Sequence, residues 1–294
     1  MADPDRVSFH GVFDDPRYFA IRGDAAEVSV PGGDLIVRID AGCVTTGPWA
    51  SFGGITFAQA LVSCPMLEAH AAFLADLERG ICEQFKGVSK IVLRMATADY
   101  YPESFLATFE AACAVQNWRS AGEISYVVKA EASPPTAKHR SARRAERRGA
   151  GVTSLEPIKC FDFLASVKAD KGYPFAYSRE SFVAQVDRFP YAFGCYGVEC
   201  EHNLVAAVLE AYIGDGALLV SWDQSLTGKA IAATDYLLVH RIGALKDAGK
   251  RFVDLGTVSF GRRPNWGLAR HKGSLGGIAT LRRTYEWVAR TREA

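Results

Sequence analysis

Two cationic side chains near the end of the chain have a spacing that could hold a negatively charged group. Arg270 and Lys272 lie in a glycine-rich segment that runs from Gly267 to Gly277. Glycines let backbone amides approach a ligand closely, and a fixed cation stabilises the negative charge that builds on a carbonyl oxygen under nucleophilic attack. The segment is therefore predicted to be an anion-handling loop. The alternative for Lys272 is a surface lysine that pairs with Asp254 or with solvent.

A second concentration of positive charge lies in the middle of the chain. Residues 138–149 contain six Lys or Arg side chains and one Glu, a net charge of +5. Good helix formers followed by a glycine predict a helix here. Spacings of three and four residues place Arg140, Arg143, Arg144 and Arg147 on one helical side. That side could hold a diphosphate or a nucleic-acid backbone, and a solvated charged face is the alternative.

The cysteines do not form the signature of a metal site. The seven cysteines are scattered and no Cys-x-x-Cys pair occurs, which indicates reduced thiols rather than a disulfide framework. Cys195, Cys200 and His202 lack a fourth ligand at a usual zinc spacing. The sequence therefore predicts no metal ion.

The composition excludes several classes of protein. The chain has 34 Lys and Arg against 33 Asp and Glu, and 49% of its residues are hydrophobic. Such a chain is predicted to be globular, and not to coat nucleic acid or an anionic membrane over its whole surface. No apolar run approaches the roughly 18–20 residues that span a bilayer. The acidic start lacks the features of a signal peptide, so a cytoplasmic protein is expected.

Strands and helices that alternate through both halves must position these charged residues. Short apolar runs predict strands at residues 35–39, 53–57, 90–94, 125–129, 192–198, 204–212, 217–222 and 251–256. Helical spacing predicts helices near residues 67–85, 102–113, 161–167, 182–186 and 238–245. Gly214-Asp215-Gly216 predicts a tight hairpin between two of the strands.

The alternation contains a faint repeat. In each half a strand is followed by a polar break, a helix and a further strand, with the two strands marked by Ile55 and Ile91 in the first copy and by Leu218 and Phe252 in the second. The predicted fold class is therefore α/β, with two lobes that are each a mixed sheet flanked by helices.

Prolines and the basic stretch suggest where the lobes divide. The prolines within residues 132–136 cannot continue a strand. The first lobe is therefore expected at residues 1–131 and a basic linker helix at residues 132–149. The second lobe, with the candidate site, is expected at residues 150–294.

Three stretches of the chain contain motif-like patterns. Near the end, Asp254-Leu255-Gly256 ends a strand, Gly267-Leu268 and Arg270 follow, and Lys272 precedes the pair Gly276-Gly277. The basic stretch contains Arg140, Arg143, Arg144 and Ala145, and the first lobe contains Ser51-Phe52-Gly53-Gly54. In that order, they resemble the closing motif, the Arg-x-x-Arg-x-Ala helix between the lobes and the Ser-Pro-Tyr-Gly-Gly loop of the FemAB family, whose members resemble two fused GNAT acyltransferase lobes.

The resemblance implies GNAT-like lobes and transfer of an acyl or aminoacyl group to an amine. It implies that Lys272 stabilises the oxyanion and that Arg270 and the Arg140 side hold phosphate. No Ser-His-Asp or Cys-His arrangement is visible, so direct attack by the substrate amine is expected. Asp254, Asp223 and Glu210 are candidates for the general base.

The resemblance also indicates which side chains contact the substrate. Trp222 and Asp223 end the strand before a loop, and both are expected to bind substrate together with His271. His271 stands where the family has Phe or Tyr. The substitution either exchanges one ring for another or supplies a group that titrates.

The donor depends on the loop after Asp223. Acetyl-CoA-dependent GNAT enzymes carry Gln/Arg-x-x-Gly-x-Gly/Ala at this place, and the loop amides receive the pyrophosphate. Gln224, Gly228, Lys229 and Ala230 imitate that loop with one residue too many. An acyl-CoA donor is favoured, and an ordinary loop before a helix is the alternative.

The sequence thus predicts an N-acyltransferase that joins an activated acyl group to an amine of a cell-wall or glycan precursor, either a nucleotide sugar or a lipid-linked molecule. Two alternatives stay open. One is an aminoacyl-tRNA-dependent transferase that builds the interpeptide bridge of peptidoglycan and binds tRNA through the basic helix. The other is a non-catalytic protein that binds an anionic glycan precursor.

Overall fold

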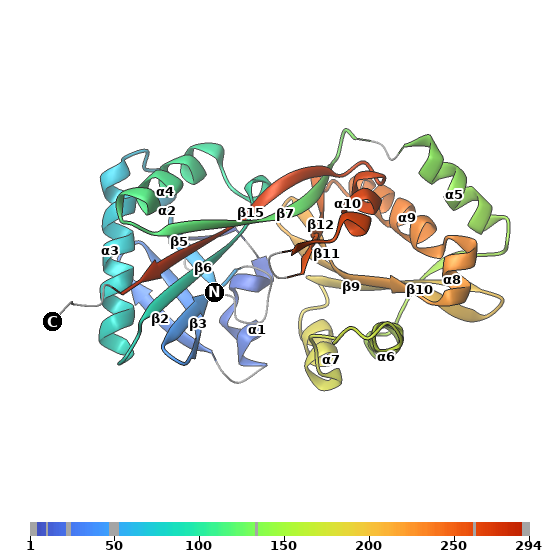
Figure 1. Cartoon of the computed structure of the whole chain (residues 1–294), viewed down its shortest axis with the longest axis horizontal. Coiled ribbons are helices and arrows are strands. Elements are labelled where there is room, and N and C mark those ends of the chain that lie inside the picture. Colours follow the sequence, from blue (N-terminus) through green and yellow to red (C-terminus); the bar gives the residue numbers. More distant parts are fainter. Residues whose placement is uncertain are drawn as a thin grey trace. The chain divides into compact units, whose positions relative to one another are not determined.

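The computed structural model describes residues 5–9, 11–21, 25–46, 53–132, 135–260 and 263–289. The chain divides into two units (Figure 1). Unit 1 comprises Met1–Glu123 and Leu281–Ala294, and unit 2 comprises Ile124–Thr280. Among the described residues, no helix combines the length and the apolar character needed to cross a bilayer.

Unit 1 is built on a mixed sheet. Its strands follow the order β1 (Arg6–Ser8), β5 (Ile55–Ala58), β3 (Gly33–Asp40), β4 (Cys43–Thr46), β6 (Lys90–Thr97) and β15 (Ile278–Val288), and β2 (Ala26–Val30) also pairs with β3. Its helical segments are η1 (Gly11–Asp14), α1 (Pro16–Ala20), α2 (Gln59–Val62), α3 (Leu67–Gln84), η2 (Ala98–Tyr100) and α4 (Glu103–Val115).

The longest helix of unit 1 shows why this sequence folds against the sheet. In α3 the buried side chains include Phe73, Leu74, Leu77 and Ile81, whose spacing of three or four residues makes one apolar face. That face packs on β2 and α4. Each large apolar side chain that is fully buried contributes about 1.5–3 kcal/mol of transfer free energy.

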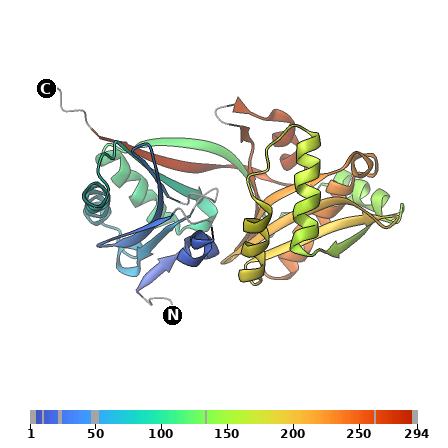
Figure 2. The same ribbon diagram turned by 90° about the horizontal axis from the view of Figure 1, so that it is seen from below.

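Unit 2 has a sheet covered on both faces. The strand order is β7 (Arg119–Lys129), β12 (Phe252–Thr257), β11 (Gly216–Gln224), β10 (Asn203–Ile213), β9 (Phe193–Cys200) and β8 (Gly151–Ser154). The helices are α5 (Thr136–Glu146), α6 (Pro157–Asp170), α7 (Arg179–Arg188), α8 (Leu226–Ile231), α9 (Ala233–Asp247) and α10 (Trp266–Gly273), and β13 (Ser259–Phe260) pairs with β14 (Arg263–Pro264). In Figures 1 and 2, α9 lies on one face of the sheet, and α6 and α7 on the other.

The two units repeat one arrangement of elements. In unit 1 the hairpin β3–β4 is followed by α3 and by β6, which is parallel to β4. In unit 2 the hairpin β10–β11 is followed by α9 and by β12, which is parallel to β11. The predicted repeat is therefore present, but its first strand is β4. The strand at Ile55 is β5, which pairs antiparallel with β3.

The units differ from the predicted lobes at their edges. β7 and β15 each run from one unit into the other, so residues 124–131 belong to unit 2 and the chain from Leu281 returns to unit 1. The basic helix α5 packs on α9 within unit 2. The sequence positions Ser51, Phe52, Ser133 and Pro134 lie outside the described residues.

Candidate functional site

The parallel ladder between β11 and β12 ends while both strands continue. Its pairs run from Gly216 and Phe252 to Leu218 and Asp254. β11 then extends to Gln224, and β12 extends to Thr257. Polar main-chain groups beyond the last pair must find partners other than the neighbouring strand. The carboxyl ends of β11 and β12 are thus the part of unit 2 where side chains or a ligand can replace the ladder.

Lys272 supplies two of these partners. The segment around it was predicted to be a loop, and this was wrong because Asn265 caps a helix: its side chain accepts a hydrogen bond of 3.0 Å from the backbone N–H of Leu268. The helix α10 carries Lys272 to the end of β12, where Nζ donates to the carbonyl oxygens of Gly256 and Thr257, each at 2.8 Å. Only 3% of Lys272 is exposed.

Asp254 lies at the same turn of β12. Its Oδ1 accepts hydrogen bonds from Ser125 Oγ at 3.0 Å and from the backbone N–H of Gly256 at 2.7 Å. Asp254 and Ser125 are each 1% exposed. The structure therefore brings the predicted pair Asp254 and Lys272 together around Gly256, whose φ of +77° suits glycine. Ser125 was not predicted, because it lies 129 residues before Asp254 and no local pattern links them.

A second group joins the side chains of β11, α10, α9 and α5. The rings of Trp222 and His271 have centroids 5.3 Å apart. Lys138 Nζ donates to Asp235 Oδ1 at 2.6 Å and lies 3.5 Å from His271 Nδ1. Trp222 and His271 were predicted as substrate contacts. Lys138 and Asp235 were not, and the only signals for them are the start of the basic run and an acidic residue in the first turn of α9.

The surroundings of His271 favour its neutral form. Burial lowers the pKa of this imidazole, Lys138 and Lys272 lower it further, and Asp235 opposes them. Within the described residues no hydrogen-bond partner reaches the buried Nε2. A neutral imidazole can either accept or donate one hydrogen bond at that atom, depending on its tautomer.

This lowered pKa predicts a pH-dependent contribution to stability. As the pH falls below the ordinary histidine value of about 6.5, the unfolded chain takes up a proton that the folded chain resists, so wild-type stability falls. His271→Phe removes this loss, and the drop in Tm between about pH 7.5 and about pH 5.5 should shrink by about 1–3 °C. His240→Gln, which changes an exposed histidine of α9, is the control. Equal drops in wild type and His271→Phe would contradict the assignment.

In the loop predicted to receive a CoA pyrophosphate, two side chains already accept hydrogen bonds from backbone amides. Ser225 Oγ accepts from the backbone N–H of Gly228 at 3.1 Å, and Gln224 Oε1 accepts from the backbone N–H of Thr234 at 3.0 Å. A Cβ at Gly228 would lie 2.2 Å from the carbonyl oxygen of Val205, so packing on β10 requires this glycine. Lys229 and Ala230 are exposed.

The basic helix α5 presents its arginines to solvent. Ala142 and Ala145 are its buried residues, and they belong to the side that packs on α9. Arg140, Arg143, Arg144 and Arg147 are exposed, and none of them forms an ion pair within the described part of the chain. Lys138, in the first turn of this helix, forms an ion pair with Asp235 of α9.

The other predicted residues lie on β11, α10 and β10. Asp223 forms an ion pair with Lys171, and its Oδ1 accepts from the backbone N–H of Gln224 at 2.8 Å. Arg270 is exposed on α10. Glu210 is fully buried, and its two carboxylate oxygens accept hydrogen bonds of 3.0 Å from Arg241.

The fold is shared with solved structures of low sequence identity. FemX gives a TM-score of 0.66 at 10% identity, over 98% of this chain and 92% of its own. L-PGS from Bacillus licheniformis gives 0.62 at 10% identity, over 92% and 91%. The C-terminal DUF2156 domain of a protein assigned as a lysylphosphatidylglycerol synthetase, from Agrobacterium fabrum, gives 0.64 at 10% identity, over 94% and 87%.

No family model matches the chain, and no curated protein matches it. The predicted α/β fold class is confirmed, with a mixed sheet flanked by helices in each unit, and this fold is shared with FemX and L-PGS. Membership of the FemAB family stays a prediction.

Proposed function

We propose that the chain transfers an acyl or aminoacyl group to an amine, with the reacting carbonyl at the carboxyl ends of β11 and β12 in unit 2. The observation that carries this proposal is the buried ammonium of Lys272, fixed by two carbonyl oxygens at the point where the strand ladder ends. A preorganised cation in a dry site stabilises developing negative charge far better than one in water. The acceptor proposed from the sequence is an amine of a cell-wall or glycan precursor.

The chemical step needs no covalent enzyme intermediate. The amine nitrogen attacks the acyl carbon and forms the new C–N bond, and the carbonyl oxygen becomes an oxyanion close to Lys272. The oxyanion then reforms the carbonyl while the bond to the leaving thiolate or alkoxide breaks. The proton lost by the amine passes to that leaving group. Asp254, held by Ser125 and by the Gly256 amide, fixes the turn of β12 that Lys272 contacts.

Two donors are supported by different features. Acyl-CoA is the donor favoured by the loop from Gln224 to Ala230, although the side chains of Ser225 and Gln224 already occupy two of the amides that follow β11. Aminoacyl-tRNA is the second candidate, and the exposed, unpaired arginine side of α5 favours it because a polyanion neutralises such a surface.

The arginine side gives a direct test of the tRNA donor. A triple variant in which Arg140, Arg143 and Arg144 become Gln is expected to bind tRNA about 10–100-fold more weakly, because three phosphate contacts are lost. The dependence of log Kd on log salt concentration should fall by about 2–3. A matched variant with Lys86, Arg119 and Arg188 changed to Gln removes three exposed charges elsewhere and should bind as wild type does. Equal loss in both triples would reject α5 as the tRNA surface.

A coupled assay tests the transfer itself. Wild-type protein is incubated with acetyl-CoA or with charged tRNA, each with a panel of amino-sugar nucleotides, and amide formation is followed by mass spectrometry. Amide formed from one donor supports the proposal and identifies that donor. Absence of amide from every donor, together with tight binding of an anionic precursor, would replace the proposal by the non-catalytic alternative.

A further inference from the structure

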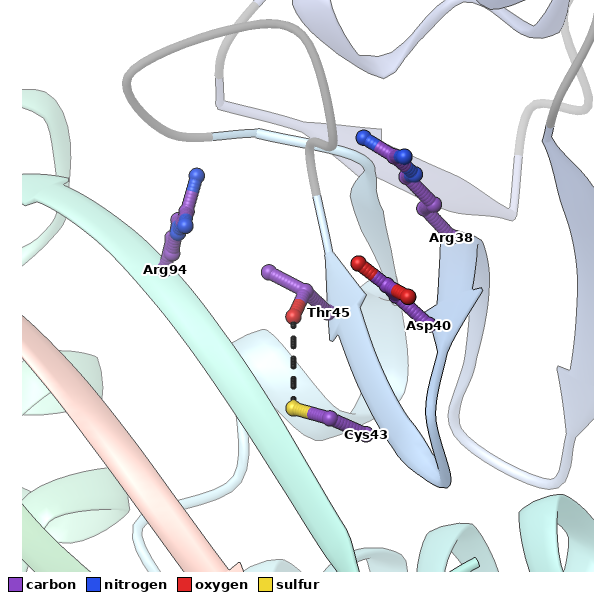
Figure 3. A pocket seen from close by; sticks show the side chains of 5 residues that line it. All are labelled: Arg38, Asp40, Cys43, Thr45 and Arg94. Atoms are coloured by element: carbon purple, nitrogen blue, oxygen red, sulfur yellow. Dashed lines mark hydrogen bonds between the residues drawn. The ribbon is translucent and has the colours of Figure 1, made fainter.

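Unit 1 contains a polar cavity that the proposed transfer reaction does not use. Its volume is about 230 Å³, several times the ~30 Å³ that a water molecule occupies in the liquid. It is lined by Arg38 and Asp40 of β3, Cys43 and Thr45 of β4, and Arg94 of β6. Figure 3 shows Arg94 on one side of the cavity and Arg38 with Asp40 on the other, with Thr45 between them.

The polar lining is specific to unit 1 and is not required by the fold. The strand registers show which residue of unit 2 occupies the position of each cavity residue. Cys43 corresponds to Gly216, because each is the first residue of the parallel ladder in its unit. The other cavity residues are matched by counting along the paired strands from this point. The corresponding residues of unit 2 are Ala211, Ile213, Gly216, Leu218 and Gly256. The five positions that hold glycine or apolar residues in unit 2 therefore hold two arginines, an aspartate, a cysteine and a threonine in unit 1.

In the described part of the chain, the helices that precede the sheet are shorter in unit 1 than in unit 2. In unit 2 the chain before β9 forms α6 and α7, of 14 and 10 residues, and α6 packs on β10 and β11. In unit 1 the described chain before β2 forms η1, of 4 residues, and α1, of 5 residues. Alternation along a strand places Arg38 and Asp40 of β3 on one face, and Val37, which is fully buried, on the other.

Arg94 is a half-buried cation without a carboxylate partner among the described residues. Burial lowers the pKa of its guanidinium, and the neighbouring Arg282 lowers it further, against smaller effects of Glu123 and Cys43. Arg282 forms its own ion pair with Glu123. Among the described residues, the cavity lining contains two guanidinium groups, those of Arg38 and Arg94, and one carboxylate, that of Asp40. A partly buried charge is costly unless it is paired.

We propose that this cavity binds the phosphate group of a small phosphate ester. The guanidinium groups of Arg38 and Arg94 donate hydrogen bonds to phosphate oxygens from two sides, and the Thr45 hydroxyl donates a hydrogen bond to a third oxygen. Asp40 accepts a hydrogen bond from a hydroxyl or ammonium group on the esterifying substituent. Its negative charge also disfavours a second phosphate at that end of the cavity. The volume suits a compact ligand, since sites for drug-sized molecules occupy roughly 300–1,000 Å³.

Thermal shift measurements test the proposal with defined ligands. Inorganic phosphate and O-phosphoethanolamine should raise the Tm of the wild-type chain in a saturable manner, with O-phosphoethanolamine effective at lower concentration than pyrophosphate. Arg94→Gln should weaken both interactions about tenfold or more. Without ligand, the Tm of Arg94→Gln should equal or exceed that of wild type, because a half-buried charge beside Arg282 is gone. Arg119→Gln, which removes an exposed arginine of the same unit, should bind as wild type does.

Alkylation of the cavity thiol provides a second readout. Cys43 lines the cavity, whereas Cys82 is exposed on α3. Saturating O-phosphoethanolamine should slow reaction of Cys43 with N-ethylmaleimide, followed by peptide mass spectrometry, and should leave Cys82 unaffected. Vesicles of phosphatidylcholine with and without phosphatidylethanolamine distinguish a lipid headgroup from a soluble ester. Protection by the soluble ester alone assigns the site to soluble ligands, and protection by the phosphatidylethanolamine vesicles assigns it to lipid.

The proposal fails if phosphate gives no saturable shift, or if Arg94→Gln and Arg119→Gln bind equally well. It also fails if ligand protects Cys43 and Cys82 alike. These measurements require no acyl transfer, so their outcome is independent of the function proposed for unit 2.

Discussion

Lys272→Met is expected to lower kcat for amide formation about 10²–10³-fold while KM changes little, the loss typical of removing one oxyanion-stabilising group. The ammonium is held by the carbonyl oxygens of Gly256 and Thr257, so its position is set before substrate binds. A methionine has similar length but supplies neither charge nor N–H donors. Single-turnover rates with the donor identified by the coupled assay would measure the effect.

The same substitution leaves two buried carbonyl groups without their donor, which costs about 1–3 kcal/mol for each group that stays unsatisfied. Activity must therefore be compared at a temperature where both proteins are folded, with the folded fraction checked by circular dichroism. Lys159→Met, which removes an exposed lysine paired with Glu199, is the control and should retain activity. A folded Lys272→Met protein with wild-type kcat would show that the ammonium only holds the end of β12.

Arg241→Met is expected to cost about 3–5 kcal/mol of unfolding free energy, because it leaves the carboxylate of Glu210 buried without its partner. Arg241 on α9 makes two hydrogen bonds to Glu210 on β10, and its guanidinium carbon lies 3.4 Å from the centroid of the Tyr196 ring. The pair therefore joins α9 to the sheet of unit 2. Denaturant titration measures the loss.

Two further measurements separate this explanation from a simple packing defect. The double variant Glu210→Gln/Arg241→Met carries no buried charge and should recover most of the lost stability. Burial already raises the pKa of Glu210, and without Arg241 the rise is larger. A raised carboxyl pKa means that stability is lost as the pH rises, so the deficit of Arg241→Met should be larger at about pH 8 than at about pH 5. A deficit that is independent of pH would contradict the assignment.

Sequence patterns predicted the elements with strong local signals. Apolar runs placed β3, β6 and β12, and the Gly214-Asp215 turn between Ile213 and Gly216 is the expected tight hairpin. The helix α10 was missed because its flanking glycines resemble a loop, although Asn265 was a usable capping signal. The repeat was assigned to the wrong strand because β4, with two threonines among its four residues, was not predicted as a strand, and only its pairing with β6 identifies it.

The candidate site was predictable where a contiguous motif carries it and not where the fold assembles it. Asp254 and Lys272 belong to one stretch of the chain, and they meet at Gly256. Ser125, by contrast, reaches Asp254 across 129 residues, and Lys138 reaches Asp235 across 97. The spacing of apolar residues along the sequence does not predict such long-range contacts. The cavity of unit 1 was likewise missed, because its lining residues come from three separate strands.

The paths of β7 and β15 have a consequence for how the chain is assembled. β7 comes from the first half of the sequence and pairs with β12 in unit 2, whereas β15 comes from the second half and pairs with β6 in unit 1. Neither half of the gene product can complete its own sheet, and a fragment ending before β15 would expose the edge of β6 to aggregation. During synthesis, the sheet of unit 1 therefore stays incomplete until β15 has left the ribosome and can pair with β6.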